Sequence, residues 1–435
     1  MKKVGLVINR IRLALFPIGY GMIGALVGGT LNRVFIADIG LAASLVGFVF
    51  AIQYLVSPAR VWLGYRSDGF PILGKRREPY MILGTLVLGI GIIFAAFLAV
   101  SATAGTLMLV LGMIIAFIVY GLGRNLAHNS YQALLTDIFS PEKRQRAITL
   151  YEVATLVGSV AGAGALGGAL KVYEPSKLIS VTIGASLAAL VFALVGAIRQ
   201  EPAVEQDAAE KARTQNFIQT LKEIVLPDPQ VRLFFLIVMF TFIGTFAQDD
   251  FLEPYGALVL NMEVGATTRL TAFWGIGVLI SMLISGLFLI KWLGYLRLMR
   301  IGIVASALVF IGVIGAGLAG NPGAFRILVL FMGLGAGLAG AGMLSGLITF
   351  TTSIRAGLLM GVWGMANLIG KAIGAMMGGV VIDLMRLAFG NAFLAYAALF
   401  AIEVILLFLA LYLTTRLDIQ ASKASQEEVG APVTA

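Results

Sequence analysis

The chain has 435 residues, of which 59% are hydrophobic and only 12% are charged, and its mean hydropathy is +0.97. These values exclude an ordinary water-exposed globular surface and place most of the chain in lipid. The sequence contains no cysteine, which excludes disulfides and thiolate metal sites but leaves the redox compartment open.

Apolar stretches recur along the whole chain, and each has the roughly 20 residues that a helix needs to cross a bilayer. The sequence therefore predicts an all-α integral membrane protein with twelve transmembrane helices. The predicted spans are 13–36, 40–62, 80–100, 105–128, 147–170, 178–198, 232–252, 270–290, 298–319, 325–349, 357–382 and 391–414. The basic N-terminal segment runs into the first span without a small-residue cleavage site, so we expect no removable signal peptide.

Lysine and arginine are distributed unevenly between the two sides that these spans define. Of the 31 basic residues, the side opposite the N-terminus receives Arg33, Lys171, Lys177, Arg269, Arg326 and Arg386. Because short basic loops stay in the cytoplasm, we predict a bacterial inner-membrane protein with both termini cytoplasmic. The net charge of +9 then follows from topology, and no nucleic-acid partner is expected.

The longest polar interval lies between the sixth and seventh spans and divides the chain into two halves. We predict an N-terminal six-helix bundle at 1–198, a cytoplasmic linker at 199–231, a C-terminal six-helix bundle at 232–416 and a disordered cytoplasmic tail at 417–435. Two such halves are typical of the major facilitator fold, in which a substrate cavity lies at the midplane between the bundles.

The loop between the second and third spans contains Gly64-Tyr65-Arg66-Ser67-Asp68-Gly69 and then Gly74-Lys75-Arg76-Arg77. It resembles the major facilitator loop pattern of glycine, aspartate, glycine and a basic run. The glycines permit a tight turn, and Asp68 can face the positive end of a neighbouring helix. We interpret Asp68 as a conformational latch, with a plain topogenic loop as the alternative. Asp137, which closes the fourth span, is a candidate partner of Arg66 or Arg76.

Several spans contain polar side chains, which are costly in lipid and should face the bundle interior or a water-filled cavity. In the fourth span, one helical face carries residues at four-residue spacing, with two asparagines beside it. These candidate cavity residues are Arg124, His128 and Gln132, with Asn125 and Asn129. His128 is the only histidine in the chain.

The seventh span carries a second polar group towards its outer end, formed by Gln248, Asp249, Glu253 and Tyr255. We expect Pro254 to interrupt the helix, so that freed backbone carbonyls line a cavity. The alternative is that this group shapes a helix break and a gate between the halves.

The last two spans carry a third polar group. Trp363, Asn367 and Lys371 lie at four-residue spacing on the eleventh span, and Glu403 lies near the middle of the twelfth. We predict an intramembrane pair of Lys371 with Glu403; otherwise Lys371 faces the cavity. Trp274 and Trp363 offer flat surfaces for a ring, although tryptophan is common near membrane interfaces for other reasons.

Three segments resemble one branch of the major facilitator class. The first half contains Arg12-Leu13-Ala14-Leu15-Phe16 with Gly29-Thr30-Leu31-Asn32-Arg33-Val34, and Tyr65-Arg66-Ser67-Asp68 with Arg76-Arg77-Glu78-Pro79-Tyr80. The second half contains Gln248-Asp249-Asp250-Phe251-Leu252-Glu253-Pro254-Tyr255-Gly256 and then Val264-Gly265-Ala266-Thr267-Thr268-Arg269-Leu270-Thr271-Ala272-Phe273-Trp274. In these segments the chain resembles the PucC/LhaA family, the bacteriochlorophyll delivery branch of the major facilitator superfamily. Asp250 departs from the aliphatic residue expected there.

The resemblance implies a role in photosynthesis, in which (bacterio)chlorophyll is handed to light-harvesting antenna polypeptides during their assembly. It also implies pigment-synthesis proteins as partners and an intracytoplasmic photosynthetic membrane as a location. Bound bacteriochlorophyll or chlorophyll would be the cofactor, with His128 or Glu253 as the magnesium ligand and no metal intrinsic to the protein. The ordinary alternative for His128 is a side chain hydrogen-bonded to helix neighbours, and Arg124 beside it suits an acidic lipid head group or a propionate-like carboxylate.

Two other functions stay open at this point. The first is a proton-coupled secondary transporter of a small organic solute, driven through Asp249, Glu253 or Glu403. The second is a structural subunit that lies against an antenna or reaction-centre complex. An enzyme is not expected, because one histidine, no cysteine and no nucleotide-binding glycine loop leave little catalytic equipment.

Overall fold

The computed structural model describes residues 9, 11–57, 59, 70–101, 107–139, 141–201, 229–350 and 356–417. Within these ranges the chain is almost entirely helical, and ten of the described helices are long and apolar enough to cross a membrane. The predicted all-α membrane fold is therefore confirmed.

The first half of the chain forms α2, α3 and α5 to α8. Helix α2 (Leu15–Ala25) continues through π-helical turns at Leu26–Leu31 and Val34–Asp38. The others are α3 (Ala43–Leu55), α5 (Glu78–Ser101), α6 (Leu107–Ile138), α7 (Pro141–Ala169) and α8 (Pro175–Ala197). Helix α6 runs well past the predicted end of its span at 128, because its polar residues face other helices and do not end the helix.

The second half begins with α11 (Pro229–Phe246), a 3-10 turn called η5 (Ala247–Asp250) and the short α12 (Leu252–Leu258). It continues with α13 (Val264–Ile284), the π-helical η6 (Ser285–Leu289), α14 (Ile290–Leu318), α15 (Pro322–Phe350), α16 (Ala356–Phe389) and α17 (Ala392–Thr414). Gly294, with a φ of 71°, breaks the helical run between α13 and the main part of α14.

The ten long helices and the twelve predicted spans agree once two features are considered. The apolar run Val264–Leu318 holds two predicted spans, which the break at Gly294 separates. The second predicted span corresponds to α3, a shorter apolar helix of 13 residues, and most of its predicted continuation to residue 62 falls outside the described residues. Each predicted span therefore has its helix.

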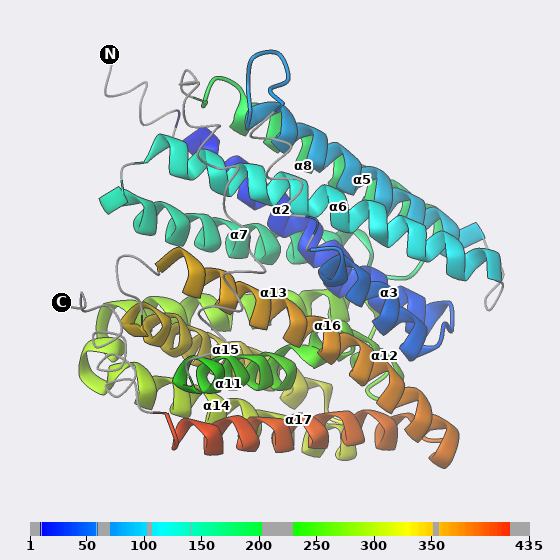
Figure 1. Ribbon diagram of the computed structural model, residues 1–435. Coiled ribbons are helices and arrows are strands. Elements are labelled where there is room, and N and C mark those ends of the chain that lie inside the picture. Colours follow the sequence, from blue (N-terminus) through cyan, green and yellow to red (C-terminus); the bar gives the residue numbers. More distant parts are fainter. Residues whose placement is uncertain are drawn as a thin grey trace.

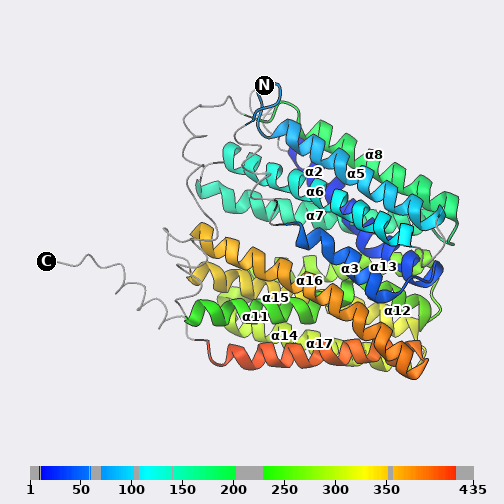
Figure 2. The same cartoon turned by 45° about the vertical axis from the view of Figure 1, so that its right-hand side comes forward.

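The helices are arranged as two bundles, one from each half of the chain. Figure 1 shows α2, α3 and α5 to α8 together in blue to green, and α11 to α17 together below them. The rotated view in Figure 2 separates the same two groups. Helix α2 begins and α17 ends at the same end of the molecule, here called the terminal end; the opposite end is called the far end (Figure 1). Most of the predicted linker and tail lies outside the described residues, so their boundaries stay predictions.

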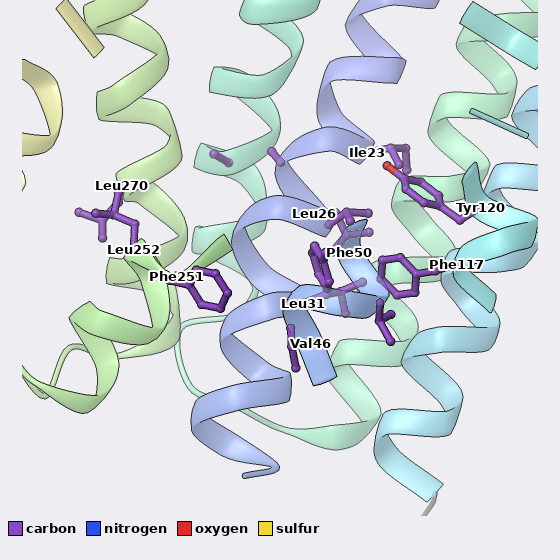
Figure 3. Packing of buried hydrophobic residues seen from close by; sticks show 14 of the residues in the cluster. Ile23, Leu26, Leu31, Val46, Phe50, Phe117, Tyr120, Phe251, Leu252 and Leu270 are labelled. Atoms are coloured by element: carbon purple, nitrogen blue, oxygen red, sulfur yellow. The ribbon is translucent and has the colours of Figure 1, made fainter. Parts of the chain in front are cut away.

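Large aromatic side chains fill the interior of the first bundle. Phe50 of α3 packs against Phe117 of α6 with ring centroids 4.8 Å apart, and Phe35 lies edge-on to Phe50 at 6.3 Å. Figure 3 shows Phe50 and Phe117 beside Leu26 and Leu31 of the π-helical turn that follows α2, with Phe251 of the second bundle nearby. Since lipid is as apolar as these side chains, close van der Waals packing holds such bundles together.

Candidate functional site

The two bundles meet closely at the far end, where α3 crosses α16. A Cβ on Gly47 would overlap the carbonyl oxygen of Ala375, and one on Gly379 would overlap that of Ala43, so the backbones touch at both points. Asp383 of α16 accepts hydrogen bonds from the N–H groups that begin α3, at 3.0 and 2.7 Å. The preceding residue gives α3 no side-chain cap, so Asp383 supplies one from the other bundle.

A second crossing joins α7 to α13 at the same end. The N–H of Gly265 donates to the carbonyl of Lys171 at 3.4 Å, and a Cβ on Gly265 would overlap the backbone of Gly167. The hydroxyl oxygens of Thr30 and Thr268 are 3.3 Å apart across the same interface. The bundles are thus joined at the far end by close backbone contacts at two crossings, α3 with α16 and α7 with α13.

Polar and aromatic side chains gather between the bundles on the terminal side of these crossings. We call this group the inter-bundle site. Its members with described interactions are Tyr20, Gln53, Tyr54, Arg124, His128, Tyr151 and Glu152 from the first bundle, and Asp249, Asp250 and Lys371 from the second.

Arg124 is the most fully defined member of the inter-bundle site. Its Nε donates to the Tyr20 hydroxyl at 2.8 Å, and its Nη1 donates to Oε1 of Gln53. The guanidinium carbon lies 5.6 Å from the ring centroid of Tyr20 and 5.9 Å from that of Tyr54, within the range of cation–π attraction. Two neighbouring helices, α2 and α3, therefore hold one half-buried cation in a fixed orientation.

His128 lies one turn from Arg124 on the same face of α6. Its ring centroid is 5.5 Å from that of Tyr20 and 5.4 Å from that of Tyr151. The predicted polar face of the fourth span is thus brought against α2 and α7. Asn125 does not share it, because its amide donates back to the carbonyl of Gly121 at 2.8 Å.

Charged groups from both bundles interact through Lys371. Asp249 and Glu152 are among the charges that act on this ammonium group, and they come from opposite bundles. Glu152 is exposed although it lies on a helix long enough to span the membrane. The region between the bundles therefore carries charged groups from both sides.

The predicted pair of Lys371 with Glu403 is wrong. The charges acting on Lys371 are Asp249, Arg124, Glu152 and Asp250. Glu403 is 0% exposed, and neither of its carboxylate oxygens has a hydrogen-bond partner in the described part of the chain. The rotation of α16 turns Lys371 towards the first bundle, which was the alternative left open.

The helix break in the second half falls earlier than expected. The chain leaves the α-helix at Ala247–Asp250, and Pro254 lies in the first turn of α12, where its missing N–H costs nothing. Glu253 is 2% exposed and accepts a hydrogen bond from Thr271 at 2.7 Å, beside Gly29 of the first bundle. Glu253 thus lies in the closed far-end interface, and its role in a gate stays a prediction.

Two other residues of this motif are buried inside the second bundle. Gln248 is 0% exposed, and its amide donates to the carbonyl of Thr245 at 2.6 Å. Tyr255 is 0% exposed, donates to the carbonyl of Val313 at 2.9 Å and packs against Phe400. Neither lines the inter-bundle site.

The remaining candidates are half-buried. Trp274 lies against Gly333 of α15, and the ring of Trp363 is 6.1 Å from that of Phe242. Asn367 lies one turn from Lys371 on α16, and Asn129 and Gln132 lie on α6 beyond His128. No ring contact between either tryptophan and the first bundle is present in the described residues.

The predicted latch is described only in part. Asp68 and Arg66 lie outside the described residues, so their role stays a prediction. Asp137 forms an ion pair with Nε of Arg77 at 3.0 Å. The sequence predicts Arg66 or Arg76 as its partner, and the partner in the structure is instead the residue next to Arg76.

A reciprocal carboxylate clamp holds this loop at the terminal end. Glu78 accepts three backbone N–H bonds from residues 199–201, at 2.7 to 3.1 Å. Glu201 accepts in return from the N–H groups of Arg76 and Arg77, at 2.7 and 2.9 Å. The start of α5 and the segment after α8 therefore fix each other.

Sequence reasoning missed several functional candidates. Glu152 is an ionisable residue within a predicted span, and that signal was available. Asp383 lies just past a predicted span end, where a carboxylate is unremarkable. Tyr20 and Tyr54 carry no local signal, because an aromatic residue in an apolar helix is as common in a core as in a site.

The overall arrangement is that of a membrane protein with the major facilitator fold. A bacterial homologue of the human lysosomal transporter Spinster, solved in an inward-facing and unoccupied conformation, superposes with a TM-score of 0.69. It is 16% identical, and the match covers 98% of each chain. At this identity the likeness shows the fold alone.

The chain belongs to the PUCC protein family, whose model matches residues 30–422. It is similar to Protein PucC of Rhodobacter capsulatus, with 31% identity over 424 residues, 92% of this chain and 90% of that protein. It is also similar to the Bacteriochlorophyll synthase 44.5 kDa chain of the same species, with 31% identity over 405 residues, 90% of this chain and 92% of that protein. The resemblance stated from the sequence is thereby confirmed.

Proposed function

We propose that this protein delivers (bacterio)chlorophyll during assembly of light-harvesting antenna and binds pigment in or beside the inter-bundle site. Family membership over nearly the whole chain supports this role, as does a relative whose name refers to bacteriochlorophyll. The observation that carries the proposal is that the half-buried ring of His128 lies 5.5 Å from the ring of Tyr20 and 5.4 Å from that of Tyr151.

The chemistry of that placement suits a large flat ring. Tyr20 and Tyr151 place two aromatic rings in contact with His128, and the half-buried Tyr20 is the more exposed of the two. A neutral imidazole nitrogen can supply the axial ligand that magnesium in such a ring requires. Glu253 is the weaker of the two magnesium-ligand candidates, because it is sealed in the far-end interface.

The role is proposed to be non-enzymatic, with pigment leaving the protein chemically unchanged. Antenna polypeptides and pigment-synthesis proteins would be the partners, and both termini would lie in the cytoplasm. A synthase activity, which the name of one relative suggests for that relative, predicts a change in the pigment instead.

The test is purification in mild detergent from a pigment-making host. The wild-type protein should carry a red-shifted tetrapyrrole band, and His128→Ala should lose most of it. Tyr412→Ala is the matched control, because it removes an exposed ring outside the inter-bundle site. A colourless wild-type protein, or equal loss in both variants, would contradict pigment binding at His128, and chemically altered pigment would point to an enzyme.

A second function has one specific observation in its favour. Glu152 and Asp249 act on the same Lys371 from opposite bundles, which is an arrangement suited to coupling ion binding to bundle movement. A proton-coupled transporter of a small organic solute would then acidify proteoliposomes during solute uptake, and Glu152→Gln would abolish the coupling. Solute uptake without proton movement would remove this alternative.

A further inference from the structure

Arg124 carries a charge that the described protein leaves without an ion pair. No carboxylate of the described residues lies within ion-pair distance of its guanidinium group. Its printed hydrogen bonds go to a phenol and an amide, which orient the charge but do not neutralise it. A cation inside a membrane protein is costly, so an unneutralised one marks a place for an anion.

The geometry leaves one side of the guanidinium group available. Nε and Nη1 are engaged by Tyr20 and Gln53, whereas Nη2 makes no hydrogen bond within the described ranges. The rings of Tyr20 and Tyr54 fix the plane of the group. Because a guanidinium group presents a planar fork of donors, its free edge matches a carboxylate.

The surroundings show what kind of molecule would bring that carboxylate. The ring of His128 lies beside Tyr20, one helical turn from Arg124. One turn further along α2 from Tyr20, Gly24 has open space where a side chain would be. A ring-containing, mainly apolar body fits this environment, with its acidic group at Arg124.

The nearest competitor for Arg124 comes from the other bundle. Asp250 acts on this cation at long range but does not reach ion-pair distance. It therefore lowers the positive potential at Arg124 without occupying the free edge of the guanidinium group.

We infer that Arg124 binds a carboxylate of the ligand, so that the preferred ligand is a free acid and not its ester. Where the ligand is a pigment, this inference rests on the proposed function. It then distinguishes pigments that carry a free carboxylate from pigments in which that group is esterified. The free-acid form of the macrocycle would bind more tightly than the form esterified with a long alcohol. The protein would then take its ligand before esterification or release it upon esterification.

The experiment compares acid and ester forms of two ligand types in the purified full-length protein. The first type is bacteriochlorophyllide against bacteriochlorophyll, followed by absorption. The second is dibromostearate against its methyl ester, followed by quenching of tryptophan fluorescence. For each protein variant we take the ratio of acid affinity to ester affinity, and we compare this ratio between variants. Because partitioning of the ligands into detergent is the same for all variants, it cancels in the comparison.

Wild-type protein should prefer the acid about 10- to 100-fold more than Arg124→Gln does, as expected for a charge-assisted hydrogen-bond pair. Arg326→Gln is the matched control, because it removes an exposed arginine far from the site, and it should keep the preference. If Arg124→Gln does not fold, Asp250→Asn still tests the inference, because removing the competing carboxylate should tighten binding of the acid. Weaker acid binding in Asp250→Asn would overturn it.

The outcomes separate this inference from the proposed function. Pigment bound with no acid preference overturns the inference and leaves pigment delivery standing. An acid preference for the fatty acid, with neither pigment bound, supports the carboxylate site and contradicts pigment delivery. Loss of a copurifying anionic phospholipid in Arg124→Gln, without any acid preference, would assign the anion to a lipid phosphate and overturn the inference.

Discussion

Asp383 supplies the helix cap of α3 from the opposite bundle, so its removal should loosen the far-end closure. Asp383→Ala deletes both acceptors of the N–H groups at 3.0 and 2.7 Å. Loss of an aspartate cap costs about 0.5–2 kcal/mol, and the lost charge at a helix N-terminus adds a few tenths to about 1 kcal/mol. A cost of one to two kcal/mol raises the population of the opened form by roughly 5- to 30-fold. Asp383→Asn keeps one acceptor oxygen and should show a smaller rise.

Cysteine labelling measures this opening cleanly, because the natural chain has no cysteine. Thr268→Cys places a single thiol at a fully buried position of α13, opposite Thr30 of the first bundle. Its reaction rate with a water-soluble maleimide should increase in the Asp383→Ala background. Glu174→Ala is the matched control, because it removes an exposed carboxylate that pairs only locally with Lys177. The same labelling rate with Asp383 and with Asp383→Ala would refute the reasoning. An increase of the rate by the same factor in Glu174→Ala would also refute it.

Three further substitutions test the packing described above. Gly47→Val would force a side chain onto the carbonyl of Ala375, and overpacking of about 1–3 kcal/mol should lower Tm and speed labelling at the far end. Glu78→Gln weakens three backbone hydrogen bonds, and a loss of about 1–2 kcal/mol should lower Tm. Tyr255→Phe removes the bond to Val313, so the free energy of unfolding in detergent titration should fall by about 1 kcal/mol while pigment binding is unchanged.

Each of these has a control of the same chemistry. Gly315→Val adds a side chain where the structure has open space, so an effect as large as that of Gly47→Val would show that steric overlap is not the cause. Glu174→Gln removes a charge at an exposed position and should leave Tm unchanged. Tyr412→Phe removes an exposed hydroxyl, and an equal loss of stability there would contradict the importance of the buried bond of Tyr255.

The helices could be predicted from the sequence because the bilayer fixes their length and apolar character. The break at Gly294 falls between the predicted spans 270–290 and 298–319, because Lys291, Arg297 and Arg300 interrupt the apolar pattern there. The bend before Pro254, in contrast, was misplaced. Proline is tolerated in a first helical turn, so it can follow a break as readily as cause one.

The site was predictable within one helix and not between helices. The spacing of Arg124 and His128 fixes a common face, because a helix has 3.6 residues per turn. The partner of Lys371 depends on how α16 is rotated against its neighbours, which spacing within α16 does not determine. The same limit hid the full burial of Glu403, whose carboxylate oxygens have no hydrogen-bond partner in the described part of the chain.

The touching backbones of α3 and α16 also have a mechanical consequence. The crossing at Ala375 lies near the far end of α16, whose other end begins at Ala356, 19 positions earlier. At 1.5 Å per residue, this arm is about 28 Å long, so a tilt of roughly 10° at the crossing would displace its end by about 5 Å. A small tilt at these glycine contacts would therefore produce a large displacement at the terminal end.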